Sequence, residues 1–155
     1  MGAHRMNVPK ELAEYKLERA EIVVYLPADW NISDHEEKNY WPLRWLKILA
    51  RLPLEEDSWL GWGHSVPNGK PFAENTQLSS VLLINPENVE EGAAVCQLPN
   101  GEEVNFYQMI PLYEEEVNFK IQNGAETLLG KMGEISAVVD IHRLNVCEGF
   151  GRPKE

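Results

Sequence analysis

The sequence lacks a run of apolar residues long enough for a membrane-spanning helix, which needs about 18 consecutive positions. The segment that follows Arg5 at the start of the chain is polar and is not typical of a signal peptide. We therefore expect a cytoplasmic protein that has no membrane partner.

Cysteine is scarce. The chain has 2, Cys96 and Cys147, and they lie far apart in the sequence. This pattern favours reduced, packed thiols over a disulfide framework. The 4 histidines are too scattered for the regular ligand spacing of a metal site: they are His4, His35, His64 and His142. The sequence therefore predicts no metal and no other cofactor.

Basic residues are few, with 14 Lys and Arg against 25 Asp and Glu, which gives a net charge of −11. A protein that binds nucleic acid directly needs a basic face to neutralise phosphates, so this balance argues against such a partner. The acidic groups at 55–57, 87–91, 102–103 and 114–116 are interpreted as solvated faces and turns. The same charge would attract a basic protein partner.

Motifs for nucleotide binding and nucleophilic catalysis are missing. No P-loop occurs, and Pro67 stands where a nucleophile elbow centred on Ser65 needs glycine. His64 and Ser65 are neighbours, and neighbouring residues of a strand point to opposite faces. Nothing in Glu114–Glu116 singles out a desolvated member for acid–base work, and a helix-capping role fits at least as well. These residues indicate no reaction.

The most informative stretch is Trp59–Phe72. Its glycines and prolines exclude a helix, and among them lie two tryptophans, a histidine and an Asn-Gly turn. We predict a short aromatic strand over residues 59–66 that leads into a shaped loop at Val66–Gly69. Aromatic loops on a rigid scaffold are often recognition sites. The alternative is that Trp59 and Trp62 are core residues.

Elsewhere the pattern alternates strands with helices. The expected strands are Glu21–Leu26, Gln77–Ile84, Ala93–Leu98, Val104–Ile110 and a short Ala137–Ile141, with Pro99–Gly101 as a hairpin turn. The expected helices are one turn after Pro9, a helix from Trp41–Pro42 to Pro53 with an apolar stripe at Trp45, Ile48, Leu49 and Leu52, and a helix after Pro111 that Asn123–Gly124 ends or interrupts. The tail is expected to fray from Glu148. We predict an α+β fold: a mixed β-sheet with a β-hairpin, flanked by helices.

Several groups of residues form an ordered series along the chain: Ala20–Ile22 with Tyr25–Trp30, Trp41–Lys47, Gly63–Gly69, Phe72 with Leu82–Leu83, Phe106–Tyr107 and Ile110–Glu116. No single motif is decisive. Together, their order and spacing resemble the suppressor of fused-like domain family over about residues 6–132.

The resemblance implies a mixed α/β sandwich and a protein-binding function. Animal members are two-domain regulators that sequester a transcription factor of the Hedgehog pathway. This chain is similar to the single-domain bacterial members, some of which are proposed to be immunity proteins that neutralise toxins. We expect residues 1–155 to form one such domain that lacks the family's N-terminal strand and helix material. The sheet edge left exposed would favour a homodimer or a covering partner.

We therefore expect a non-enzymatic domain that binds and masks a partner protein. Its candidate contact residues are Trp59, Trp62, His64, Asn68, Tyr107 and Tyr113. The alternative is an enzyme or a small-ligand-binding protein with a pocket where His64 meets the acids near Glu115. A structural subunit of a larger assembly is a third interpretation, which predicts one broad apolar patch.

Overall fold

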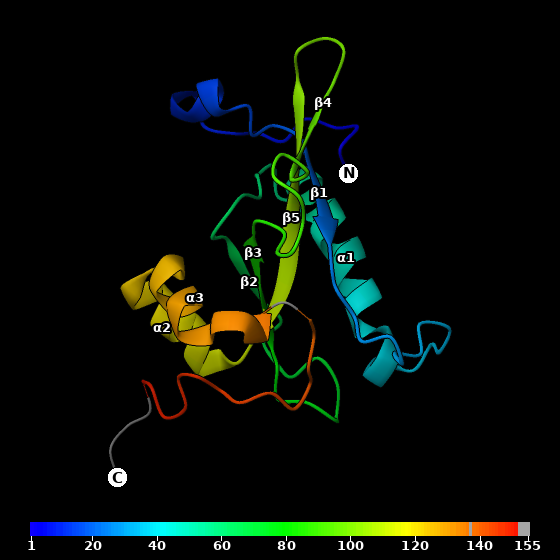
Figure 1. Ribbon diagram of the computed structural model, residues 1–155, viewed down its shortest axis with the longest axis vertical. Helices are drawn as coiled ribbons and strands as arrows, with labels where there is room; N and C mark the ends of the chain where they lie inside the picture. Colours follow the sequence, from blue (N-terminus) through cyan, green and yellow to red (C-terminus); the bar gives the residue numbers. More distant parts are fainter. Residues whose placement is uncertain (137, 152–155) are drawn as a thin grey trace. The chain divides into compact units, whose positions relative to one another are not determined.

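The computed structural model describes residues 1–136 and 138–151 of the chain (Figure 1). Its elements, in chain order, are η1 (Lys10–Tyr15), β1 (Ala20–Val23), α1 (Glu37–Glu55), β2 (Ser65–Pro67), β3 (Ser80–Ile84), β4 (Val95–Gln97), β5 (Glu103–Leu112), α2 (Glu114–Asn123), α3 (Ala125–Met132) and η2 (Gly133–Ser136). The predicted α+β class is confirmed.

The strands form one mixed sheet with the order β1-β5-β3-β2, and β4 pairs with β5 off this path. β1 runs parallel to β5, whereas β2 is antiparallel to β3 and β4 is antiparallel to β5. The predicted hairpin is the β4–β5 pair, and its turn needs Gly101 because φ there is 84°. β1 and β2 stand at the two ends of the strand order. The expected homodimer through a sheet edge stays a prediction.

The apolar runs of the sequence become the buried strands of the sheet. All five residues of β3 are buried, as is the second half of β5 from Tyr107 onward. A strand covered on both faces has no solvent-facing positions, so its sequence is predominantly apolar rather than alternating. The strand predicted over Gln77–Ile84 therefore corresponds to β3, although β3 begins only at Ser80.

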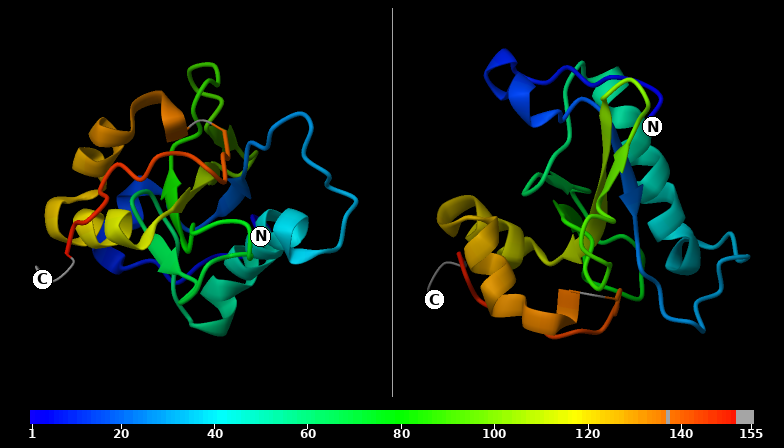
Figure 2. Two further views of the ribbon diagram at one scale, coloured as in Figure 1. Left: turned by 90° about the horizontal axis from the view of Figure 1, so that it is seen from below. Right: turned by 45° about the horizontal axis from the view of Figure 1, so that its top comes forward.

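Helix α1 is longer than predicted, because it begins at Glu37 and contains both Pro42 and Pro53. Each proline removes one backbone donor. The burial of Trp45 (5 % exposed) and Leu49 (0 %) outweighs this cost. Residues 42–55 of the helix run alongside β1 (Figures 1 and 2). Ile48, which was predicted to belong to the same apolar stripe, is exposed at its margin.

The chain is divided into two compact units. The first unit comprises Met1–Val24, Pro42–His64 and Leu83–Met109, and the second comprises Tyr25–Trp41, Ser65–Leu82 and Ile110–Glu155. Each unit has its own buried side chains. In the first they include Trp45, Leu49, Leu60, Leu83 and Tyr107. In the second they include Trp41, Leu78, Leu82, Ile110, Leu112 and Leu128.

One prediction for the end of the chain differs from the structure. Of the predicted strand Ala137–Ile141, Ala137 lies outside the described residues, and residues 138–141 are not a strand. Residues 138–151, which we call the C-terminal strap, are irregular. The tail expected to fray from Glu148 includes residues 152–155, which lie outside the described residues, so the fraying stays a prediction. Phe150 packs edge-on against Phe119 of α2, with ring centroids 5.2 Å apart.

Gly124, with φ of 93°, separates α2 from α3, so the predicted interruption is confirmed.

The two thiols are free, but only one of them is packed: Cys96 is exposed and Cys147 is buried. Burial also raises the pKa of the Cys147 thiol. We therefore expect Cys96 to react rapidly with Ellman's reagent in the native protein and Cys147 to react only on unfolding. The released chromophore measures both rates. Equal rates for the two thiols in the native protein would contradict the burial of Cys147.

Within the described residues, no helix is both long and apolar enough to cross a membrane.

Candidate functional site

Residues 59–64 form a turn in the first unit that we call the Trp62 loop. The predicted aromatic strand is wrong here, because only Ser65–Pro67 is strand. The backbone N–H of Gly61 donates to His64 Nδ1 at 3.2 Å, and the His64 ring lies edge-on to Trp59 with centroids 4.4 Å apart. The N–H of Gly63 donates to the carbonyl of Leu83 at 2.7 Å. The loop is therefore fixed at both ends.

Two glycines allow this conformation. A Cβ on Gly61 would lie 2.6 Å from the Trp59 ring, so the indole folds over a position that must stay bare. Gly63 has φ of 81°, a left-handed conformation that other residues rarely adopt. The consequence is that Trp62, between these glycines, remains 44 % exposed on a rigid turn.

The six predicted contact residues divide between the two units. Trp59, Trp62 and His64 come together in the Trp62 loop of the first unit. Tyr107 belongs to the same unit but is only 3 % exposed, and burial raises its pKa, so it serves packing rather than contact. Asn68 and Tyr113 belong to the second unit.

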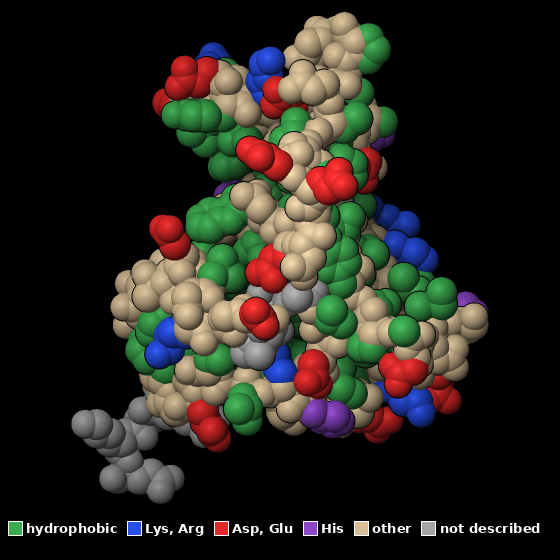
Figure 3. Space-filling view, in the orientation of Figure 1, with side chains coloured by type: hydrophobic (Ala, Val, Ile, Leu, Met, Phe, Trp, Pro, Cys, Tyr) green, Lys and Arg blue, Asp and Glu red, His purple; other side chains and the backbone are tan. Residues whose placement is uncertain are grey.

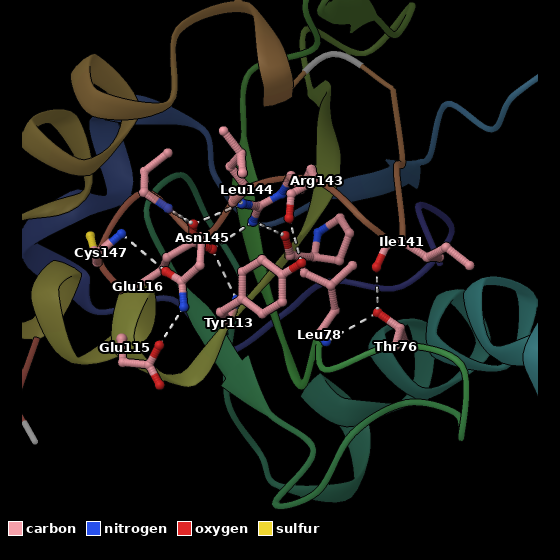
Figure 4. Close-up of polar contacts among 12 residues, drawn as sticks. Thr76, Leu78, Tyr113, Glu115, Glu116, Ile141, Arg143, Leu144, Asn145 and Cys147 are labelled. Carbon is pink, nitrogen blue, oxygen red and sulfur yellow. Dashed lines mark hydrogen bonds and ion pairs between the residues drawn. The ribbon is translucent and has the colours of Figure 1, made fainter. Parts of the chain in front are cut away.

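The second unit is organised around one buried ion pair, shown in Figure 4. Glu116 of α2 is fully buried, and Arg143 of the strap is 7 % exposed. The guanidinium donates to the two carboxylate oxygens at 2.7 and 2.5 Å. It also donates to the carbonyls of Pro111 and Leu144, each at 2.9 Å. All these bonds are intramolecular, so Arg143 serves to hold the strap.

The Glu116 carboxylate also satisfies two backbone donors, the N–H of Tyr113 at 2.9 Å and the N–H of Val146 at 3.1 Å. The first is a capping bond at the start of α2. The expected capping role of 114–116 is thus confirmed for Glu116, which the sequence did not distinguish from its two neighbours.

Tyr113 stands between α2 and the strap. Its hydroxyl donates to the carbonyl of Arg143 at 2.6 Å, and the Arg143 guanidinium lies over its ring, 4.9 Å from the centroid. Burial raises the pKa of Tyr113, while the nearby Arg143 charge acts in the opposite direction. The phenol therefore stays a hydrogen-bond donor at neutral pH.

Two adjoining pockets share Tyr113 and Gln77 in their linings, and we call the two pockets together the Tyr113 groove. The larger has a volume of about 550 Å³ and the smaller about 370 Å³. The other side chains that line the larger pocket are Pro67, Lys70, Pro71, Ser79, Ser80, Glu114, Glu115, Arg143, Leu144, Asn145 and Glu148. Those of the smaller pocket are Glu74, Asn75, Thr76, Ile141 and His142.

Sequence reasoning missed Arg143, Leu144 and Asn145, the strap residues that form one wall of this groove. No motif marked them, because their partners lie about thirty positions away on α2. The alternative interpretation of the sequence places His64 in one pocket with the acids near Glu115. In the structure Glu115 lines the larger pocket of the second unit and accepts a bond from the Asn145 amide, whereas His64 belongs to the first unit.

The described part of the chain contains no group of three His, Cys, Asp or Glu side chains arranged to hold a metal ion.

Comparison with known proteins gives one consistent family. Residues 1–144 match the model of the family described as Suppressor of fused protein (SUFU). A Ureaplasma parvum protein, "Uncharacterized protein UU111", is 28 % identical over 144 residues, which are 92 % of this chain and 68 % of that protein.

Solved structures share the fold. A putative SUFU homologue from Neisseria gonorrhoeae superposes with a TM-score of 0.55 at 21 % identity, covering 69 % of this chain and 57 % of that chain. Drosophila Suppressor of Fused gives 0.58 at 16 % identity, covering 69 % of this chain and 25 % of that chain. The Sufu–Fu complex also gives 0.58 at 16 % identity, with 69 % and 46 % covered. The match thus spans less than two thirds of each of these chains, and at these identities the likeness shows the fold alone.

Proposed function

Because this chain belongs to the Suppressor of fused protein (SUFU) family, we propose that it is a non-enzymatic domain that binds and masks a partner protein. Among the similar structures, one is described as a complex of Sufu with Fu, so a protein of this fold engages another protein there. The proposal for this chain depends on its own residues.

The observation that carries the proposal is the exposed Trp62 on a rigid loop. Tryptophan is the residue type most enriched among side chains that dominate binding energy at protein interfaces. The bond from Gly61 to His64 and the packing of Trp59 hold the loop in place before a partner arrives. Binding therefore spends little free energy on ordering these side chains.

The charge of the chain favours a basic partner. Acidic side chains are spread over the face shown in Figure 3 rather than gathered in one patch, and the net charge is −11. Such a field accelerates association with a basic protein and makes it sensitive to salt. A basic toxin, neutralised by an immunity protein that covers its working surface, is the partner that we propose on this ground.

The arrangement of His64 gives little support to a catalytic pocket. Its Nδ1 accepts the Gly61 N–H, so this nitrogen holds no proton to donate, and its ring packs against Trp59. These contacts support a bracing role for the imidazole.

The test is affinity capture of the partner from native lysate with the parent chain and with Trp62→Ala. Val89→Ala is the matched control, since Val89 is 43 % exposed in the same unit, against 44 % for Trp62. We expect Trp62→Ala to lose about 2 kcal/mol or more of binding free energy to one protein, identified by mass spectrometry, that Val89→Ala retains. Raised salt should weaken the same interaction.

Two outcomes would overturn the proposal. One is a captured protein that both variants retain as well as the parent does. The other is that neither the parent chain nor the variants specifically retain a protein at either salt concentration, although the circular dichroism of the variants matches that of the parent. For the toxin proposal, co-expression of the captured protein with this chain should restore growth, and co-expression with Trp62→Ala should not.

A further inference from the structure

We infer that the Tyr113 groove of the second unit binds an extended peptide segment of the partner, with a Lys or Arg side chain against its glutamates and an apolar side chain against Leu144. The inference rests on the proposed function, because it assumes a protein partner. It concerns a different surface from the Trp62 loop and adds the chemistry of the segment that is recognised.

Leu144 is an apolar side chain that the structure keeps in water on a fixed backbone. It is 83 % exposed, although the residues on both sides of it are anchored. The Tyr113 hydroxyl holds the carbonyl of Arg143, the Arg143 guanidinium holds the carbonyl of Leu144, and the Asn145 amide donates to Glu115. Covering such a side chain is favourable and requires little ordering of the strap.

The charges of the larger pocket are predominantly negative. Glu114, Glu115 and Glu148 line it, while the positive charge of Arg143 is already neutralised by Glu116. Lys70 is the other cation of this lining and can donate to a peptide carbonyl. The excess of carboxylates favours a cationic side chain in the pocket.

The smaller pocket extends this acidic lining past Tyr113, because Glu74 lines it. A segment that reaches the smaller pocket would therefore meet a further carboxylate.

The combination of groups selects a polypeptide over a small cation. Free arginine or a polyamine could neutralise the glutamates but would leave Leu144, Pro67 and Pro71 uncovered. A volume of about 550 Å³ lies within the range of sites that enclose a ligand. A peptide places its cationic and apolar side chains at neighbouring positions, as this lining requires.

The test uses labelled synthetic peptides and fluorescence polarisation at low and at physiological ionic strength. The probe is Gly-Ser-Leu-Arg-Leu-Ser-Gly, whose two leucines allow either chain direction. Matched peptides replace arginine by glutamate or both leucines by serine, and free arginine serves as a competitor. We expect the probe to bind about tenfold or more tightly than either matched peptide, with weaker binding at the higher ionic strength.

Protein variants then assign the binding to the groove. Leu144→Ser and the double variant Glu114→Gln with Glu148→Gln change exposed side chains, so the fold should be retained. Each variant should lower the affinity for the probe about fivefold or more. The control variant Glu126→Gln changes an exposed charge on α3 of the same unit and should bind the probe as the parent does. Equal affinity for the three peptides, undiminished binding by both groove variants, or free arginine competing as well as the probe would overturn the inference.

The two proposals fail separately. If Trp62→Ala abolishes partner capture while the probe shows no preference, the groove inference is wrong and the proposed function stands. If the probe binds the groove and no captured protein depends on Trp62, the Trp62 loop is not the contact surface, while the preference of the groove for a cationic and apolar segment stands. Trp62→Ala itself should leave probe binding unchanged, because Trp62 is not a groove residue.

Discussion

Replacing Arg143 by methionine is expected to lower the free energy of unfolding by about 3–5 kcal/mol. The change leaves the Glu116 carboxylate, which is fully buried, without the guanidinium that compensates its charge. It also leaves the carbonyls of Pro111 and Leu144 without their side-chain donor. Urea denaturation followed by circular dichroism measures the loss. For a chain of ordinary stability, it is a large part of the total.

A double-mutant cycle shows whether the ion pair is the cause. Glu116→Gln removes the charge and keeps one acceptor oxygen, which can serve the N–H of Tyr113 or that of Val146 but not both, because they bond to different carboxylate oxygens. The double variant should therefore lose less stability than the sum of its two single changes. Arg51→Met, an exposed arginine of α1, is the control and should change stability by about 0.5 kcal/mol or less. Additive losses across the cycle would show that Glu116 and Arg143 act independently.

Sequence reasoning succeeded where a local signal sets the structure. The hairpin at Pro99–Gly101 and the break at Gly124 follow from turn chemistry within a few residues. Helix α1 and strand β3 follow from the spacing of apolar residues. The ends of these elements were less well predicted, because Pro42 and Pro53 are tolerated within a helix stabilised by buried neighbours.

The candidate site was harder to predict because its contacts are distant in sequence. Glu116 and Arg143 are 27 positions apart, and no property of Glu114–Glu116 tells which member is buried. Leu144, in an apolar-looking segment near a predicted strand, had no feature to mark it as the most exposed of the large hydrophobic side chains described. Tyr107 and Trp62 show the same limit, since both aromatics suit either a core or a surface.

Replacing Phe72 by alanine is expected to cost about 3–5 kcal/mol of stability. Phe72 is 6 % exposed and stacks on Trp41, with ring centroids 4.6 Å apart and planes inclined by 2°. Its backbone N–H donates to the carbonyl of Leu78. This bond and the packed ring together hold the segment that directly follows Pro67 and Pro71, which line the groove. Losing it opens a cavity against Trp41. Denaturant midpoints with unchanged slopes would report this change as stability alone.

Two further substitutions at the same stack separate packing from polarity. Phe72→Leu keeps most of the buried volume and should cost about 1.5 kcal/mol. Trp41→Phe removes a buried indole N–H that has no acceptor among the described residues, so part of its packing loss is offset by relief of that unpaired donor. It should therefore cost less than Phe72→Ala, although tryptophan is the larger side chain. If Trp41→Phe proved the more destabilising of the two, relief of the unpaired indole N–H would not offset the lost packing, and the prediction would be wrong.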